Sequence, residues 1–448
     1  MKYNPSLHKL SNGISVIFDP MELETTFVKI RFNTGSRDEK PSQYGITHFC
    51  EHMFCKGTHR FPNRDMTRKF TGKNGLSWGA STGNSVLNFY GESLPDKLDV
   101  LIDFLADRLS DSLFDSESIE KERGAILDER NRCLDQDSTK YDDMVDKELF
   151  GNKNAVFCSK TLGSPENIKS FTREQMLAFI EKRMSATNCT IIVSGKIENQ
   201  KQVLETLEQK FQFLKPFNVP ENKGIKYTPN QAHLSIPNRN SIVINILFQQ
   251  LYPMDKEHRF QRLCIDIWRM FLEIKLSECL RTDNSLVYGI HNINILDDNN
   301  NLLLDGIQTQ TAPKNIKKCV ELIAQTCADV YYNNTMTQED LDLLNSRARM
   351  IDARFLDSRT DRERKLLDYY YQNKELYNFD ADKKLKNSIT LQDITKYTRG
   401  MFNDKTMSIL TMGAGYNCDL IEIWRKNFKP NNRKKSVMRD AVNWPLMR

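Results

Sequence analysis

The chain has 448 residues, of which 39% are hydrophobic and 27% charged, so two or three domains with sizeable cores can form. Its 64 basic and 59 acidic residues leave a net charge of +5, an excess too small to indicate a nucleic-acid partner. No run of 18 apolar residues occurs in the sequence, so we expect no membrane-spanning helix and no membrane partner.

The N-terminal residues lack both the apolar core of a signal peptide and the Arg-rich amphipathic character of a mitochondrial presequence. We therefore expect a cytoplasmic protein, with an organelle as the alternative. The ten cysteines form no C-x-x-C pair, so reduced thiols are expected. Cys50 and Cys55 flank the histidine motif described below. Packing is the expected role of both, because Cys50 would project from a different helix face than the histidines.

The first half of the chain alternates between strand and helix patterns. Alternating apolar residues predict a strand at 26–32, and the apolar period of 95–111 predicts a helix. The acidic stretch 115–120 is typical of a helix start, and this helix should continue to about residue 133. The other expected elements are a helix at about 43–56, a Gly-rich stretch at 72–83, and strands at 85–92 and 190–195.

A stretch rich in Pro, Asn and Lys at 214–223 indicates a linker, which we place at 215–235 between domains 1–214 and 236–448. The second half begins again with a strand pattern. Its expected elements are a strand at 241–248, a helix at 256–281, a strand pair around 297–301, and helices at 313–331 and 337–356. Because the order of elements repeats, we infer a diverged internal duplication.

His48, Glu51 and His52 form the pattern H-x-x-E-H, the reverse of the commoner H-E-x-x-H zinc-peptidase motif. Residues four apart lie one turn apart on the same helix face, so both imidazoles can reach one metal ion. Glu51 precedes the second histidine and would lie near the water that such an ion carries. The second half has no such pattern, so any metal chemistry belongs to the first half.

A catalytic zinc usually takes three protein ligands and keeps a fourth position for water, so a third ligand must come from elsewhere. The segment 119–130 is the candidate, because Glu122 and Glu129 are two helical turns apart and share one face. Glu129 could bind the metal, and Glu122 could hold a ligand histidine through its second ring nitrogen. Acidic residues on a helix more often form a solvated face, so spacing alone leaves the third ligand open.

The segments 35–39, 45–58 and 120–129 together resemble the pitrilysin, insulysin and mitochondrial processing peptidase family of zinc metallopeptidases. The family pattern is H-x-x-E-H, a long spacer, and then two glutamates separated by six residues. This chain matches the pattern without adjustment. The resemblance implies an α+β fold of two homologous α/β-roll domains, each a mainly antiparallel sheet packed on helices.

The resemblance also implies roles for individual residues. Family members bind one zinc ion per chain through ligands that correspond to His48, His52 and Glu129. The general base of the family corresponds to Glu51, and the glutamate that supports a ligand corresponds to Glu122.

A second resemblance lies at 280–289, where Arg281 and Tyr288 match an arginine and a tyrosine that contact substrate in the family. The alternative is that Tyr288 is a packed strand residue and Arg281 a helix-end cation. One departure concerns residue 79. The family often carries Asn-Ala-x-Thr here, and the Asn helps to hold the substrate backbone. This chain has Ala80 and Thr82, but Gly79 offers no side-chain amide.

The motif and the resemblance together predict a zinc-dependent endopeptidase that cleaves extended peptides or unfolded protein segments, with Glu51 taking a proton from the attacking water. Some family members enclose a chamber with four such domains in one chain. This chain has about half that length, which implies a homodimer or a heterodimer with a related subunit. One alternative is a catalytic subunit that depends on its partner. The others are a non-catalytic binding protein on the same fold and a structural zinc site, which usually has four protein ligands.

Overall fold

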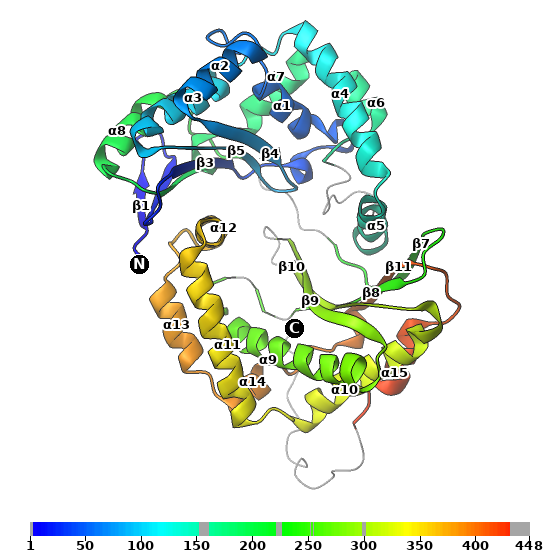
Figure 1. Cartoon of the computed structure of the whole chain (residues 1–448). Helices are drawn as coiled ribbons and strands as arrows, with labels where there is room; N and C mark the ends of the chain where they lie inside the picture. Colours follow the sequence, from blue (N-terminus) through cyan, green and yellow to red (C-terminus); the bar gives the residue numbers. More distant parts are fainter. Residues whose placement is uncertain are drawn as a thin grey trace. The chain divides into compact units, whose positions relative to one another are not determined.

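The computed structural model describes residues 3–151, 161–220, 226–250, 252–253, 255–297 and 302–430. The chain forms two compact units (Figure 1). Unit 1 comprises Met1–Thr228, Asp297–Asn301 and Arg349–Ala381, and unit 2 comprises Pro229–Leu296, Leu302–Ala348 and Asp382–Arg448. Within the described part of the chain, no helix combines the length and the apolar character needed to cross a membrane.

Unit 1 is built on a six-stranded sheet with the order β1-β2-β6-β3-β5-β4. Its neighbours pair antiparallel except for β2 and β6, which are parallel. The strands are β1 (Ser6–Lys9), β2 (Ser15–Pro20), β3 (Thr26–Phe32), β4 (Ser77–Thr82), β5 (Leu87–Ser93) and β6 (Cys189–Gly195). The helices are α1 (Ile46–Phe54), α2 (Arg64–Asn74), α3 (Leu98–Ser110), α4 (Ser116–Leu134), α5 (Asp137–Val145), α6 (Pro165–Ser170), α7 (Arg173–Arg183), α8 (Gln200–Lys210) and α12 (Arg359–Asn373).

The main core of unit 1 lies between one face of this sheet and a layer of helices (Figure 1). Helix α1 contacts β4, and α3 contacts β3 and β5. Buried residues alternate with half-buried ones along β5, as expected for a strand with one face toward the core. Buried Phe32, Phe54, Phe89 and Phe104 belong to this core, which therefore fixes α1 against the edge of the sheet.

The other face of the unit 1 sheet is covered by α12, which comes from the second half of the sequence. Leu366 and Leu367 of this helix pack against Ile17 and Ile192. Because helices cover both faces, β6 is buried at every position. The division into domains 1–214 and 236–448 assigns the segment 349–381 to the second domain, whereas in the structure this segment packs in unit 1. Sequence periodicity cannot report such a long-range contact.

Charged side chains reinforce the contact of α12 with the sheet. The guanidinium of Arg362 donates to both carboxylate oxygens of Asp19, with 2.9 Å between Nε and Oδ2, and both side chains are fully buried. Glu363 accepts a hydrogen bond from Lys29 of β3. Asp19 thus has a cationic partner in the interior of unit 1, where an unpaired carboxylate would be costly.

Unit 2 contains a five-stranded sheet with the order β7-β11-β8-β10-β9. This is the order of the unit 1 sheet without β1, since the parallel pair β7 and β11 corresponds to β2 and β6. The α+β class and the duplicated arrangement are therefore confirmed. The strands are β7 (Gln231–Ser235), β8 (Ile242–Gln249), β9 (Val287–Asp297), β10 (Leu302–Thr311) and β11 (Met407–Gly413). The helices are α9 (Arg259–Ser277), α10 (Ile316–Asn333), α14 (Leu391–Tyr397) and α15 (Leu420–Asn427), while α11 (Gln338–Asp357) and α13 (Phe379–Asn387) include residues of both units.

The segment 215–235, which we expected as a linker, ends in a strand. Residues Gln231–Ser235 form β7 and pair in parallel with β11, which lies far away in the sequence. The partly exposed side chains of β7 produce no apolar alternation, so local pattern reading misses this edge strand.

We expect Arg362→Ala to lower the free energy of unfolding of unit 1 by about 3–5 kcal/mol, because the substitution leaves Asp19 buried without its cation. Chemical denaturation measures the change. Arg364→Ala on the same helix is the matched control. Arg364 is 72% exposed and pairs with Asp361, so its loss should cost no more than about 1 kcal/mol. Similar losses in both variants would contradict the assigned role of the buried pair.

Candidate metal centre

Helix α1 carries both motif histidines and is fixed at its N-terminus. The carboxylate of Glu39 accepts hydrogen bonds from the backbone N–H groups of Gly45, at 2.7 Å, and Thr47, at 2.8 Å. Gly45 has a φ of 99°, and a Cβ on it would lie 2.7 Å from the Cα of Gly163, so this helix start requires glycine. Seven of the nine residues of α1 are buried, including Cys50, which packs in the core.

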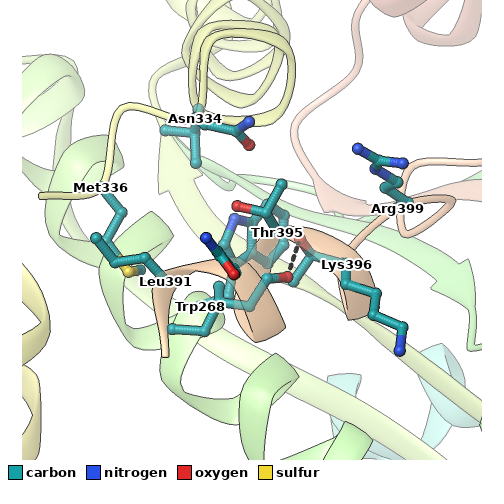
Figure 2. A pocket seen from close by; sticks show the side chains of 11 residues that line it. Trp268, Asn334, Met336, Leu391, Thr395, Lys396 and Arg399 are labelled. Carbon is teal, nitrogen blue, oxygen red and sulfur yellow. Dashed lines mark hydrogen bonds between the residues drawn. The ribbon is translucent and has the colours of Figure 1, made fainter. Parts of the chain in front are cut away.

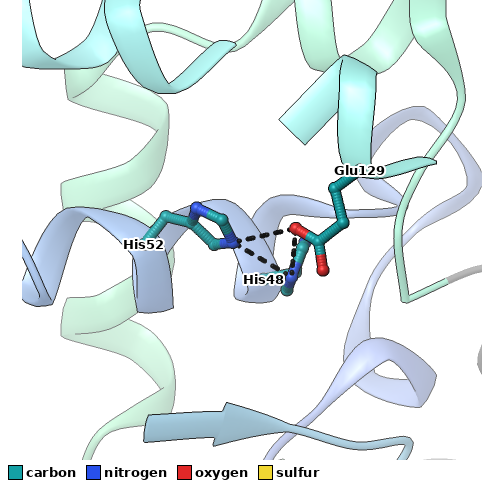
Figure 3. A group of neighbouring side chains, drawn as sticks. All are labelled: His48, His52 and Glu129. Carbon is teal, nitrogen blue, oxygen red and sulfur yellow. Dashed lines mark hydrogen bonds and ion pairs between the residues drawn. The ribbon is translucent and has the colours of Figure 1, made fainter. Parts of the chain in front are cut away.

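His48 and His52 of α1 meet Glu129 of α4 (Figure 3). The two Nε2 atoms lie 3.2 Å apart, and Oε2 of Glu129 lies 3.3 Å from Nε2 of His52 and 3.8 Å from Nε2 of His48. Burial and the neighbouring His52 lower the pKa of His48 to about 3, so this imidazole is neutral at neutral pH. Among the described residues, these three form the one group of His, Cys, Asp or Glu with metal-ligand spacing.

This arrangement fits a tetrahedral zinc ion. Ligand atoms that lie about 2.0–2.1 Å from a tetrahedral zinc are roughly 3.3 Å from one another, close to the separations between the three side chains. The charges around them also favour a dication, because carboxylates outnumber ammonium groups. The carboxylates are Glu51, Glu122 and Glu129, and the ammonium group is that of Lys56.

Glu122 holds His52 through Nδ1, the ring nitrogen that does not face His48 and Glu129. Its Oε2 lies 2.9 Å from Nδ1 of His52, so Nδ1 donates the proton and Nε2 keeps its lone pair. The other oxygen of Glu122 pairs with Nζ of Lys56. Burial alone would raise the pKa of Glu122, but the contacts with His52 and Lys56 outweigh burial and hold this pKa below its usual value. Glu122 therefore stays ionised as an anchor for the histidine.

Glu51 is held by the edge strand β4. Its Oε2 accepts a hydrogen bond of 2.6 Å from Oγ1 of Thr82. Burial raises the pKa of Glu51 and the nearby Glu129 adds to this rise, whereas Thr82 and His52 oppose it. A carboxylate with a raised pKa is a stronger proton acceptor.

A cavity of about 780 Å³ lies beside Glu51 and His52. Its wall includes Trp78 and Gly79 of β4, Cys55 after α1, and the first turns of α2 and α4. Ligand sites usually have volumes of about 300–1,000 Å³, so the cavity has room for a peptide side chain next to the three converging ligand atoms.

The structure also brings Arg281 and Tyr288 together, in unit 2. Arg281 lies in the π-helical turn that follows α9, and Tyr288 is the second residue of β9. The guanidinium of Arg281 lies 5.2 Å from the centre of the Tyr288 ring. Tyr288 is 87% exposed, which contradicts the alternative of a packed core residue. Both side chains are thus accessible to a ligand.

Unit 2 contains a second cavity, of about 420 Å³, between α9, the end of α10 and α14 (Figure 2). It is lined by apolar Trp268, Met336 and Leu391 and by cationic Lys396 and Arg399, and its lining includes no His, Cys, Asp or Glu. The imidazole, thiolate and carboxylate groups that usually bind a catalytic metal are therefore lacking from the lining of this cavity, whereas unit 1 has them beside its larger cavity.

Three residues of the site were not assigned a role from the sequence. Thr82, of the Ala-x-Thr pattern, donates a hydrogen bond to Glu51. Lys56, two residues after the end of α1, pairs with Glu122. Glu39, in the segment 35–39, accepts a hydrogen bond at the start of α1. The Ala-x-Thr pattern is the one signal that could have pointed to Thr82, since the contact itself depends on the pairing of β4 with β5.

Two family models match the chain. The model of "Insulinase (Peptidase family M16)" matches residues 21–158, and that of "Peptidase M16 inactive domain" matches residues 170–346. An "Uncharacterized zinc protease" of Rickettsia felis is 26% identical over 298 residues, which cover 66% of this chain and 71% of that protein. The mitochondrial-processing peptidase subunit beta of Dictyostelium discoideum is 32% identical over 213 residues, covering 48% of this chain and 45% of the relative.

Solved structures agree with this grouping at the level of the fold. The first half of the periplasmic protease PqqL from Escherichia coli has a TM-score of 0.80 at 16% identity, with 97% of each chain covered. A peptidase M16 inactive domain from Pseudomonas fluorescens has a TM-score of 0.76 at 16% identity, covering 93% of this chain and 99% of that one. With both halves matched by family models and with relatives named as zinc proteases, the chain belongs to peptidase family M16, the insulinase family.

Proposed function

We propose that this protein is a zinc metalloendopeptidase that hydrolyses peptide bonds in extended peptides or unfolded protein segments. The observation that carries the proposal is the convergence of His48, His52 and Glu129 beside a further carboxylate, Glu51. A structural zinc site is usually closed by four protein ligands. Among the described residues three converge here, which leaves a position for water.

The residues of the site have distinct tasks in the proposed reaction. A zinc ion held by His48, His52 and Glu129 would polarise the substrate carbonyl and lower the pKa of a water molecule. Glu51 takes a proton from the attacking water and later gives it to the leaving amine. Thr82 binds one oxygen of the Glu51 carboxylate and leaves the other oxygen for this proton.

The edge strand β4 suggests how the substrate binds. An extended peptide can add to an exposed sheet edge through backbone hydrogen bonds. A folded protein cannot bind in this way, because its backbone groups are already paired. β4 is such an edge among the described strands, and the 780 Å³ cavity lies beside it. We assign substrate contacts to Arg281 and Tyr288 as well, which the exposure of Tyr288 supports.

A partner subunit is part of the proposal. We expect a homodimer or a heterodimer with a related chain, and the Dictyostelium relative, which is named as the beta subunit of a processing peptidase, supports the heterodimer. Catalysis only in the presence of such a subunit is the second candidate, and a non-catalytic binding role on the same fold is the third. Location in the cytoplasm or in an organelle stays a prediction, since the relatives and structural neighbours include mitochondrial and periplasmic proteins.

Light scattering of the purified chain tests the assembly. We expect a mass of twice the chain when the protein cleaves peptides alone. A monomer that is inactive until a related subunit is added would support the second candidate, and an active monomer would contradict the dimer.

Glu51→Gln should retain about one zinc ion per chain and lower peptide cleavage by about 10²–10⁴-fold, because the amide cannot accept the proton from water. Metal analysis and cleavage of a quenched-fluorescent peptide library measure the two quantities. Glu117→Gln is the control, since its side chain is 79% exposed in the first turn of α4 and lines the same cavity. Turnover of Glu51→Gln at the unsubstituted rate would refute the base assignment, and absence of zinc from both proteins would favour the binding role.

Glu122→Gln should weaken zinc binding by about 10–100-fold, because His52 loses its anionic hydrogen-bond partner. Competition with a chelator measures the affinity. Glu120→Gln on the same helix is the control, since Glu120 pairs with Arg123 and does not contact the histidines. Equal affinities of the two variants would show that Glu122 does not support the ligand.

A further inference from the structure

Strand β4 ends the unit 1 sheet, with β5 on one side and no described strand on the other. An edge strand directs every second backbone N–H and C=O away from its neighbour. An extended peptide would pair with these groups under the proposed function. Side chains on either face of β4 would then lie next to the peptide. Gly79, on this strand, has no side chain to offer.

Tyr90 of β5 fills the place that Gly79 leaves. The two residues are direct cross-strand partners. A Cβ on Gly79 would lie 3.0 Å from both Cζ and Oη of Tyr90. The far end of the ring is thus located where a side chain of residue 79 would begin. The ring extends from β5 across β4, and its hydroxyl reaches the outermost strand of the sheet.

The ring of Tyr90 is held in this position from the other side. It stacks on Phe27 with 6.2 Å between ring centres and an interplanar angle of 24°. Nζ of Lys29 lies 5.9 Å from the centre of the Tyr90 ring, and this ammonium group is paired with Glu363 of α12. Packing on two neighbours pre-organises the hydroxyl, which lowers the cost of ordering it when a ligand binds.

The hydroxyl of Tyr90 makes no hydrogen bond within the described part of the chain, although the residue is half-buried. This hydroxyl is not one of the buried polar atoms that lack a partner, so water or a ligand can reach it. A peptide strand beside β4 would lie about 4.8 Å from it, so a polar atom of that peptide comes within reach of a hydroxyl located over β4.

Successive residues of a strand face opposite sides, so Gly79 and Thr82 lie on opposite faces of β4. A peptide paired with β4 would have the Glu51 carboxylate, held by Thr82, on one face and the Tyr90 hydroxyl on the other. Building on the proposed function, we propose that the Tyr90 hydroxyl hydrogen-bonds the extended peptide at this edge, and that Gly79 makes this contact possible by leaving room for the ring. Tyr90 is thus a substrate-binding residue that positions the peptide.

Peptide binding without turnover tests the contact. Fluorescein-labelled casein, an unfolded protein, is titrated with Glu51→Gln protein, and fluorescence anisotropy gives Kd. We expect Tyr90→Phe to raise Kd by about 3- to 10-fold, the effect of losing one neutral hydrogen bond. Tyr370→Phe is the matched control and should leave Kd unchanged. The Tyr370 hydroxyl hydrogen-bonds Ser15 of β2, which three strands separate from β4. Unchanged melting curves by circular dichroism exclude unfolding as the cause of a weaker Kd.

Gly79→Ala tests the role of the glycine. The added methyl group would displace the ring, so we expect a loss of affinity close to that of Tyr90→Phe. In protein that already carries Tyr90→Phe, Gly79→Ala should raise Kd little further, because the hydroxyl is already absent. Additive losses, an unchanged Kd in Tyr90→Phe, or no binding of casein would each overturn the inference. Failure of the proposed function is detected separately, as absence of Glu51-dependent cleavage. A Kd that depends on Tyr90 would support the contact even in that case.

Discussion

The packing of α1 on α4 is the contact on which the candidate site depends. Helix α4 has low overall amphipathicity, but Ile119, Glu122 and Ile126 form one buried stripe. The two isoleucines bury apolar surface on either side of Glu122, which brings this carboxylate to His52. Glu129 continues the same face one turn later and reaches both imidazoles. A core contact and a ligand set thus arise from the same face of one helix.

Much of this site could be predicted from the sequence, because its geometry is that of two regular helices. Spacing of four residues brings His48 and His52 onto one face, and spacing of seven does the same for Glu122 and Glu129. The choice of Glu129 as the third candidate ligand needed the family resemblance. The contacts of Thr82 with Glu51 and of Tyr90 with Gly79 could not be predicted, since both depend on strand pairing and side-chain packing. The α12 segment was missed for the same reason, because its partner Asp19 is separated from it by most of the chain.

The two sheets share one topology, yet only unit 1 has the metal-ligand group within the described residues. In unit 2, α9 follows β8 as α1 follows β3. Its buried face carries Leu263, Ile267, Trp268 and Phe271 in place of paired histidines. The same architecture therefore carries a candidate metal centre on this helix in one copy and apolar side chains in the other, which illustrates that the fold alone does not specify chemistry.

The order of the segments along the chain has a consequence for biosynthesis. A ribosome makes β2, with Asp19, long before α12, because Arg362 and α12 emerge only after all but one strand of unit 2. Until then, the face of the unit 1 sheet that carries Ile17 and Ile192 has no α12 to cover it. Nascent domains generally fold in order from the N-terminus, whereas unit 1 cannot be completed before most of unit 2 has been made. Premature termination after residue 129 but before residue 362 would thus release a chain that has His48, His52 and Glu129 but whose supporting sheet lacks α12.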